Sequence, residues 1–277
     1  MKRMTLCADD YAMTPGVSRA IVALAEGERI HATSCMVTTE YWQDSWSLLK
    51  PHLGSIDRGL HLNFTEGKGL SPAFRQGFPG LSTVLIKSHL RQLNSQDVLQ
   101  EVRAQINAFI TVTGCAPDFI DGHQHVHHLP QIRQALLQAM KEAVPPSCWV
   151  RSVTPLVCPN PSLKSRVIEY SGAKALRAAL KQAAYPTNSG FAGIYSLSPE
   201  EAFRPLMQTW LNDLPDKGLI MCHPGLIDHN EADVDHGKAR QIEYDYLIGE
   251  HFLTDCDNAG AQRCRLSSLL FDFEQQR

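Results

Sequence analysis

The chain has 277 residues, a formal net charge of −3 at pH 7, 43% apolar residues and 20% charged residues. This composition is ordinary for a globular protein, and the slight negative charge without a long basic run argues against a nucleic-acid surface. No stretch approaches the roughly 20 apolar residues that a membrane-spanning helix needs. The length suits one large α/β domain or two smaller ones.

The N-terminal segment superficially resembles a signal peptide, because Lys2 and Arg3 precede a short apolar run. That run is too short for such a role and ends in Asp9-Asp10, so we predict the first strand of a cytoplasmic protein. The eight cysteines form no C-x-x-C pair, which disfavours a zinc knuckle or a thioredoxin-like motif. In a reducing compartment we expect most of them to be small buried apolar residues.

Strand and helix patterns alternate along the chain. Compact β-branched or apolar runs predict strands over residues 4–8, 33–39, 58–64, a segment ending at 120, 148–153, 191–197, 218–222 and 264–267. Helical spacing predicts helices over 16–26, 42–49, 97–112, 130–143, 174–184, 199–211 and 238–253. Segments 65–93 and 154–190 are predicted as loop insertions, and long loops are usually functional or mobile.

Two helix starts carry capping signals. Thr14 is a candidate N-cap with Pro15 at the first helical position. Ser198 with Glu201 three residues later matches a capping box.

Such alternation implies a parallel sheet with helices outside it. Seven or eight units would form a (β/α) barrel-like fold, and we expect a single domain over 1–277. Active groups of such barrels lie at the C-terminal ends of the strands. The unusual polar residues of this chain fall at those positions: Asp9 and Asp10, His61 and Asn63, the histidines after residue 122, Arg151, and His223. We therefore expect them to converge on one site.

Four of the twelve histidines fall within six residues, at 123, 125, 127 and 128. Side chains alternate along an extended segment, so His123, His125 and His127 are predicted to share one face. Neutral imidazole is the commonest side-chain metal ligand. The alternative is a solvated histidine-rich loop, which the apolar flanking residues disfavour.

Asp9 and Asp10 allow two roles at a strand end, because one carboxylate can bind a metal while the other acts as a base. Helix capping is the alternative for this pair. His61 is either a ligand or a buried structural histidine, and Asn63 lies on the same face of its strand, where it could orient a ligand or substrate. One aspartate with two histidines leaves coordination positions open, as a catalytic metal requires. This ligand type suits zinc, and magnesium, manganese or cobalt also fits.

His223 ends an apolar strand and precedes Pro224-Gly225, so a turn presents its imidazole. A pKa near neutrality suits histidine to protonating a leaving group, and turn packing is the alternative. Arg151 is predicted to pair with a site carboxylate or with substrate, or to form an ordinary salt bridge.

Together these motifs resemble the YdjC-like carbohydrate deacetylase family, which includes chitooligosaccharide deacetylase. The matching segments are Ala8-Asp9-Asp10-Tyr11, Gly59-Leu60-His61-Leu62-Asn63-Phe64-Thr65-Glu66-Gly67, Asp121-Gly122-His123-Gln124-His125-Val126-His127 and Cys222-His223-Pro224-Gly225. The resemblance implies a barrel-like fold, one divalent metal ion (magnesium or zinc, with manganese or cobalt as alternatives) and hydrolytic removal of an N-acetyl group from an amino sugar.

By the same resemblance, residues matching the family's metal ligands are Asp10, His61 and His123, with Asp9 as the catalytic base and His223 as the acid. His125 and His127 then support the ligands or face the substrate, as we also expect for Asn63 and Arg151. The chain departs from the family pattern at Tyr11-Ala12, Gly122 and Gln124.

Two other classes of function fit the same residues. A metal-dependent phosphoesterase on a similar barrel would use two or more metal ions, and a non-catalytic sugar-binding or metal-storage protein would bind without turnover. The expected partner is an acetylated amino sugar, with no nucleic acid and no membrane. A homodimer is left open.

Overall fold

The strands of the computed structural model belong to one sheet. They are β1 (Lys2–Tyr11), β2 (Ala32–Cys35), β3 (Asp57–Leu62), β4 (Phe119–Gly122), β5 (Trp149–Val150), β6 (Phe191–Ala192), β7 (Gly218–Cys222) and β8 (Ala261–Arg263). The structure describes residues 1–52, 54–158, 163–227 and 236–271. The sheet order is β5-β4-β3-β2-β1-β7-β6, with β8 also paired to β1, and each of these strand pairs is parallel.

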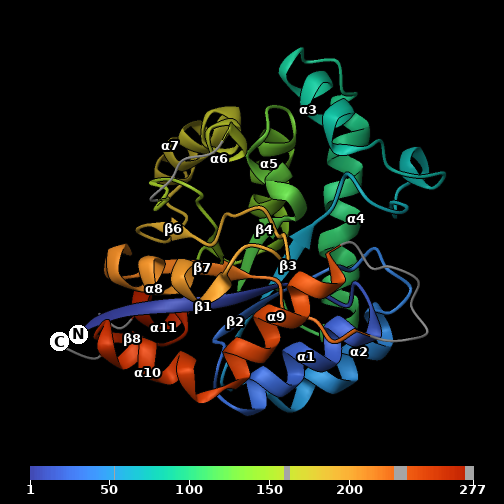
Figure 1. The fold of residues 1–277 in the computed structure, drawn as a ribbon. Coiled ribbons are helices and arrows are strands. Elements are labelled where there is room, and N and C mark those ends of the chain that lie inside the picture. Colours follow the sequence, from blue (N-terminus) through green and yellow to red (C-terminus); the bar gives the residue numbers. More distant parts are fainter. Residues whose placement is uncertain (53, 159–162, 228–235, 272–277) are drawn as a thin grey trace.

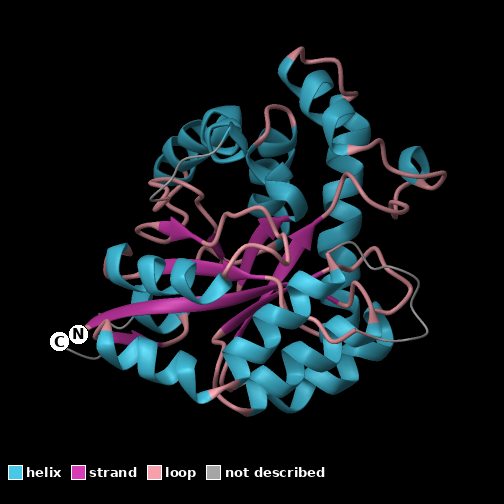
Figure 2. Ribbon diagram, viewed as in Figure 1, coloured by secondary structure: helices cyan, strands magenta, loops and turns pink. Residues whose placement is uncertain are grey.

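Helices surround this sheet (Figures 1 and 2). The α-helices are α1 (Pro15–Glu26), α2 (Trp42–Leu49), α3 (Leu81–His89), α4 (Ser95–Thr113), α5 (Ile132–Ala143), α6 (Leu163–Ile168), α7 (Lys174–Gln182), α8 (Phe203–Asp213), α9 (Gly237–Ile248), α10 (Glu250–Asn258) and α11 (Leu266–Phe271). Short 3-10 segments are η1 (Lys50–His52), η2 (Pro72–Phe74) and η3 (His123–His128), and η4 (Glu169–Ala173) is a π-helical turn.

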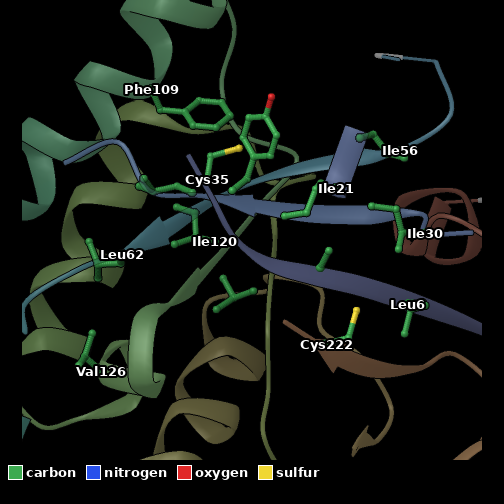
Figure 3. Packing of buried hydrophobic residues seen from close by; sticks show 14 of the residues in the cluster. Leu6, Ile21, Ile30, Cys35, Ile56, Leu62, Phe109, Ile120, Val126 and Cys222 are labelled. Atoms are coloured by element: carbon green, nitrogen blue, oxygen red, sulfur yellow. The ribbon is translucent and has the colours of Figure 1, made fainter. Parts of the chain in front are cut away.

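Strand β1 is central, and its residues from Met4 to Tyr11 are buried. Both faces of this strand are covered, because Met4, Leu6 and Ala8 belong to one buried apolar cluster and Cys7 belongs to another. A parallel strand buried on both faces need not alternate apolar and polar residues. Figure 3 shows the packing around it: Leu6 on β1 and Cys222 on β7 lie in the same buried cluster as Ile21 of α1 and Ile120 of β4. The two aspartates near the end of β1 therefore follow a buried run of the strand, and they are themselves buried.

The barrel-like fold predicted from the sequence is confirmed, and the sheet is a curled, incomplete barrel. Its strand order ends at β5 on one side and β6 on the other. The segment after β5 bridges this gap, because Val157 donates to the Phe191 carbonyl at 2.7 Å and the Phe191 N–H donates to Pro155 at 3.0 Å. Asn188 also ties the two edges, with its side chain hydrogen-bonded to the backbone of Ser152 and Gly190.

Several predicted elements differ from the structure. Segment 65–93 was predicted as a loop, but it contains η2 and α3. Leu81, Val84, Leu85 and Ser88 of α3 have the spacing of one helical face, with Val84 and Ser88 buried. That short amphipathic pattern stands between glycine- and serine-rich stretches, which hide it in the sequence.

Segment 154–190, also predicted as a loop insertion, contains α6 and η4 ahead of α7. Further differences concern where elements begin and end. Thr14 caps α1 as predicted, accepting from Val17 at 3.2 Å. The helix predicted over 199–211 begins only at Phe203, because Glu201 accepts hydrogen bonds from Ser196 instead of completing a capping box. The helix predicted over 238–253 is two helices that meet at Gly249, and the last strand is Ala261–Arg263, followed by α11.

Across the described part of the chain, no helix has the length and apolar character to cross a membrane.

Gly59 on β3 offers a test of this packing, since a Cβ there would lie 2.3 Å from the Phe119 ring. Gly59 pairs with Phe119 across β3 and β4, and Phe119 stacks on Trp149 with 4.0 Å between ring centroids. Because the two stacked rings are buried, they cannot move aside easily for an added methyl group. Gly59→Ala should therefore lower the free energy of unfolding by about 1–3 kcal/mol. Urea unfolding measures this. The control is Gly237→Ala, where a Cβ meets nothing within 4 Å and little change is expected.

Candidate functional site

A backbone irregularity turns the two aspartates of β1 toward one site. The pairing of β1 with β2 shifts register between Ala8 and Tyr11, and Asp10 has a φ of 68°. A β-bulge of this kind re-aims a side chain that regular alternation would send to the other face. Asp9 and Asp10 therefore both line one cavity, although adjacent residues of a regular strand point in opposite directions.

His61 is positioned by strand register. It lies directly opposite Asp121 in the β3–β4 pair, and its Nδ1 is 2.6 Å from Asp121 Oδ1. Its Nε2 then faces Asp10 Oδ1 at 3.3 Å. Burial alone would lower the pKa of His61, but the charges of Asp121, Asp10 and Asp9 raise it to about 10. The surroundings of this imidazole thus stabilise positive charge.

His123 reaches the same point from a turn. Strand β4 ends at Gly122, and Gln124 and His125 have positive φ angles inside η3. The prediction that alternate histidines share one face of an extended segment is therefore wrong, because the backbone coils tightly at the strand end. His123 Nδ1 lies 3.0 Å from Asp10 Oδ1, and its Nε2 lies 2.9 Å from Glu66.

Asp10, His61 and His123 form a group that fits a divalent cation. Each offers one ligand atom, and these atoms lie within 4.8 Å of one another. Both imidazoles direct their other ring nitrogen to a carboxylate, His61 to Asp121 and His123 to Glu66. Metal-bound histidines are almost always held in this way, which fixes the ring orientation and raises ligand basicity.

Asp9 belongs to a second buried group that a guanidinium already fills. Arg151 contacts both Asp9 oxygens at 2.6 Å, and its Nη2 lies 2.6 Å from Asp121 and 3.1 Å from the Cys7 sulfur. Ser34 donates to Asp9 Oδ1 at 3.1 Å. Burial would raise the pKa of Asp9, but Arg151 outweighs it and holds that pKa well below its usual range. Asp9 is therefore ionised at neutral pH.

His223 follows β7 and faces the same cavity. Its backbone N–H donates to Glu243 Oε2 at 2.6 Å, and the Tyr195 hydroxyl donates to Oε1 at 2.5 Å. Burial lowers the pKa of His223 to about 4 and raises that of Glu243 to about 7. Arg240, one turn before Glu243 on α9, donates to Asp10 Oδ2 at 2.6 Å.

The remaining predicted residues support or line the site. Asn63 is buried and holds the turn that presents Glu66, accepting from the Thr65 and Glu66 N–H groups at 3.1 Å. His127 Nε2 donates to the Arg151 carbonyl at 3.0 Å, so it holds the backbone of the residue whose guanidinium binds Asp9. His125 lines the cavity, whereas Asn63, His127 and Arg151 are not among its lining residues.

Sequence reasoning gave no role to Asp121, Arg240 and Glu243. Asp121 stands in the strand immediately before Gly122-His123, and only the β3–β4 register reveals its partner. For Arg240 and Glu243, the sequence did contain a signal of a buried role. Ala239, Arg240, Glu243 and Leu247 are the buried residues of α9, so two charged residues lie on the apolar face of a predictable helix. Charges buried in that way are almost always paired.

Geometry therefore defines an α/β protein of incomplete-barrel type, with a buried Asp-His-His group, an arginine-bound aspartate and a histidine at the C-terminal ends of its strands. The family model described as YdjC-like protein matches residues 3–258. The chain belongs to this family.

Curated relatives carry deacetylase names. The human carbohydrate deacetylase is 31% identical over 149 residues, which are 50% of this chain and 45% of that protein. The chitooligosaccharide deacetylase of Serratia marcescens is 25% identical over 250 residues, 89% of this chain and 90% of that one. The matched part of the chain spans about half the length of the human protein, and about half that of the chitooligosaccharide deacetylase of Proteus mirabilis.

A solved structure from Enterococcus faecalis V583, whose proposed role is cellobiose-phosphate cleavage, has a TM-score of 0.73 at 20% identity. The similarity covers 97% of this chain and 98% of that one. At this identity the match supports the fold, in agreement with the predicted barrel-like architecture.

Replacing Arg151 should show how much its guanidinium contributes to the stability of the fold. Arg151→Met leaves Asp9 and Asp121 as uncompensated buried charges, so we expect a loss of about 3–5 kcal/mol in the free energy of unfolding at pH 7. Wild-type Asp9 has a depressed pKa, so its contribution to stability is complete above the ordinary pKa of an aspartate and is lost as the pH falls from there through the depressed value. In the variant, burial raises this pKa, so the deficit should shrink as the pH falls and the carboxyl groups protonate.

Denaturant unfolding at pH 7 and pH 5 measures the effect of Arg151→Met. Arg103→Met is the matched control, because Arg103 pairs with Glu142 at a largely solvated site, with side chains 40% and 43% exposed. Its effect should stay within about 1 kcal/mol. Equal losses for the two variants would contradict the proposed importance of the buried network.

Ligand binding to the Asp10 group should stabilise the fold. After chelation, saturating Zn²⁺, Co²⁺, Mn²⁺ and Mg²⁺ are added in turn. An ion present at 100 times its dissociation constant adds about 2.7 kcal/mol, which should raise the Tm by roughly 5 °C or more. The increase should disappear in His123→Ala and persist in His251→Ala, a control on the exposed side of α10. An unchanged response in His123→Ala would rule out this ligand set.

Proposed function

We propose that this protein is a metal-dependent carbohydrate N-deacetylase, which hydrolyses the acetamide of an acetylated amino sugar to acetate and a free amine. The observation that carries the proposal is the juxtaposition of Asp10, His61 and His123 with an ionised Asp9 and with His223, at the floor of one cavity. Membership of the YdjC-like family, and the deacetylase names of its relatives, support the same reaction.

Asp10, His61 and His123 would hold a divalent cation. Such an ion supplies Lewis-acid polarisation of a carbonyl and a lowered pKa for bound water. The donor set fits zinc, magnesium, manganese or cobalt.

Asp9 acts as the base for the attacking water. Its Oδ2 accepts one hydrogen bond from Arg151, so a second lone pair remains to accept a proton. Arg151 fixes both oxygens of this carboxylate and keeps it ionised. Asp9 is therefore a weaker base than a free aspartate, but its carboxylate is always ionised and has a fixed orientation.

His223 passes a proton to the departing amine. With its pKa lowered to about 4, its imidazole is neutral at pH 7, so it relays a proton acquired during the reaction. Glu243 holds the His223 backbone, and Tyr195 holds Glu243. This support fixes the direction in which the imidazole faces the cavity.

The alternative function, a metal-dependent phosphoesterase, would use two or more metal ions. The second group of candidate metal ligands in this protein argues against that function. Cys7, Asp9 and Asp121 have ligand atoms within 4.8 Å of one another, but Arg151 lies among them. Its positive charge already compensates both carboxylates, so no specific observation favours a second ion there.

The deciding experiment combines acetate release from N-acetylated sugars with metal counting. We expect one divalent ion per chain, and Asp9→Asn and His61→Ala should each lower kcat/KM by at least about 100-fold. His251→Ala should retain wild-type activity. Full metal-dependent acetate release by Asp9→Asn and His61→Ala would refute the assigned roles. Release of inorganic phosphate from phosphate esters would favour the phosphoesterase, and sugar binding without turnover would indicate a non-catalytic protein.

A further inference from the structure

The cavity of the proposed active site has an apolar wall that the proposed chemistry does not use. The cavity measures about 530 Å³. Its polar floor carries the aspartates and histidines described above. The apolar wall is formed by Leu81 and Leu85 of α3, Leu129, Val167 and Ile168 of α6, and Leu197.

Exposure orders the cavity from floor to mouth. Asp9, Asp10 and His61 are 2%, 1% and 2% exposed, whereas Leu81 and Val167 are 37% and 42% exposed. The reacting groups therefore lie at the bottom. The apolar wall reaches the entrance on one side, and the exposed residues Glu66, Gln124 and His236 supply polar groups to the same lining. In Figure 1, α3 and α6 stand on either side of α5, above the sheet in this view.

Further exposed apolar side chains lie on the same two segments of the chain. Ile86 on α3 and Leu90, the residue that follows α3, are 57% and 61% exposed, and Tyr170 on η4, next to α6, is 72% exposed. With Leu81 and Val167 they make up five of the ten large hydrophobic side chains that are exposed in the described part of the chain. Two short segments flanking one cavity thus carry half of these exposed residues, and this concentration favours a binding surface over scattered surface residues.

The side of the entrance that these apolar residues form does not match a chain of sugar units. Sugar hydroxyls that leave water need hydrogen-bonding partners, and leucine and valine side chains provide none. Tyr195 is the only Tyr, Phe or Trp side chain among the described residues that line the cavity. A hydroxyl-rich group placed against Leu81 and Val167 would therefore be desolvated without compensation, whereas an alkyl group would gain from burial.

We propose that the substrate is an N-acetylated amino sugar with an apolar aglycone, such as an alkyl or isoprenoid chain, on its glycosidic side. This inference rests on the proposed deacetylase function, since that function places the acetamide at the buried floor. The sugar ring then lies above the floor, and its glycosidic substituent lies against the entrance wall of α3 and α6. A long acyl chain on the nitrogen would instead have to fit beside Ile194 and Met221, which are each 6% exposed at the closed end.

The test compares octyl, methyl and N-acetylglucosaminyl β-glycosides of N-acetylglucosamine, below the micelle concentration of the octyl compound. Each buried methylene strengthens binding by about fourfold. We expect kcat/KM for the octyl glycoside to exceed that for the methyl glycoside by at least about tenfold, and to exceed that for the disaccharide. N-hexanoylglucosamine methyl glycoside tests the acyl side and should gain nothing over the acetyl compound.

Variants locate the effect. Leu81→Ser combined with Val167→Ser changes two exposed side chains, so folding should persist, and the octyl-to-methyl ratio of kcat/KM should fall at least about fivefold. Leu48→Ser is the matched control, because Leu48 is 48% exposed on α2 and does not line the cavity. Its ratio should equal that of the wild type.

The outcomes separate this inference from the proposed function. Equal rates on the methyl and octyl glycosides, or preference for the disaccharide, would refute the apolar aglycone while the deacetylase stands. No acetate from any sugar would refute the proposed function. The inference is then judged by calorimetric binding of octyl and methyl glucosaminide, where equal affinities overturn it. If the double variant changes only the oligomeric state, the wall is an interface between copies and the proposal fails.

Discussion

The buried contact of Arg151 with Asp9 and Asp121 is the interaction on which the rest of the site depends. Three charged groups without solvent are tolerable only when each is paired at close range, and the guanidinium lies 2.6 Å from both carboxylates. Asp121 in turn fixes the ring of His61, and the Asp9 carboxylate is kept ionised. One arginine therefore links the proposed base to the histidine of the neighbouring Asp-His-His group, and His127 holds the Arg151 backbone in place.

Parallel strand geometry explains why this network forms where it does. The register of β3 with β4 sets His61 opposite Asp121, and the chain after β5 supplies Arg151 beside them. The bulge at Asp10 adds the one feature that regular strands lack, because it lets two adjacent aspartates face a common cavity. A second ring of contacts, from Glu66, Arg240 and Glu243, then orients the groups at the cavity floor.

Floor and entrance of the cavity have opposite character, and this contrast connects the chemistry to the choice of substrate. Charged and imidazole groups are concentrated where solvent is excluded, so their electrostatic interactions are strong. Leucine and valine side chains of α3 and α6 form one side of the entrance, where apolar contact with a ligand gains most from the displacement of water. Both helices lie in segments that carry none of the family motifs, which is where differences in specificity between relatives would be encoded.

From the sequence alone, the alternation of strands and helices, the capping of α1 by Thr14, and the convergence of Asp9, Asp10, His61, His123 and His223 could be predicted, because local periodicity and strand ends carry that information. The sequence could not show that α3 exists inside a glycine-rich stretch, nor that η3 coils and separates the roles of its histidines. The partners of Arg151, Asp121, Arg240 and Glu243 were also decided only by tertiary structure. Strand register and helix docking bring together residues as far apart as 230 positions, as for Arg240 and Asp10, and no local pattern encodes such a distance.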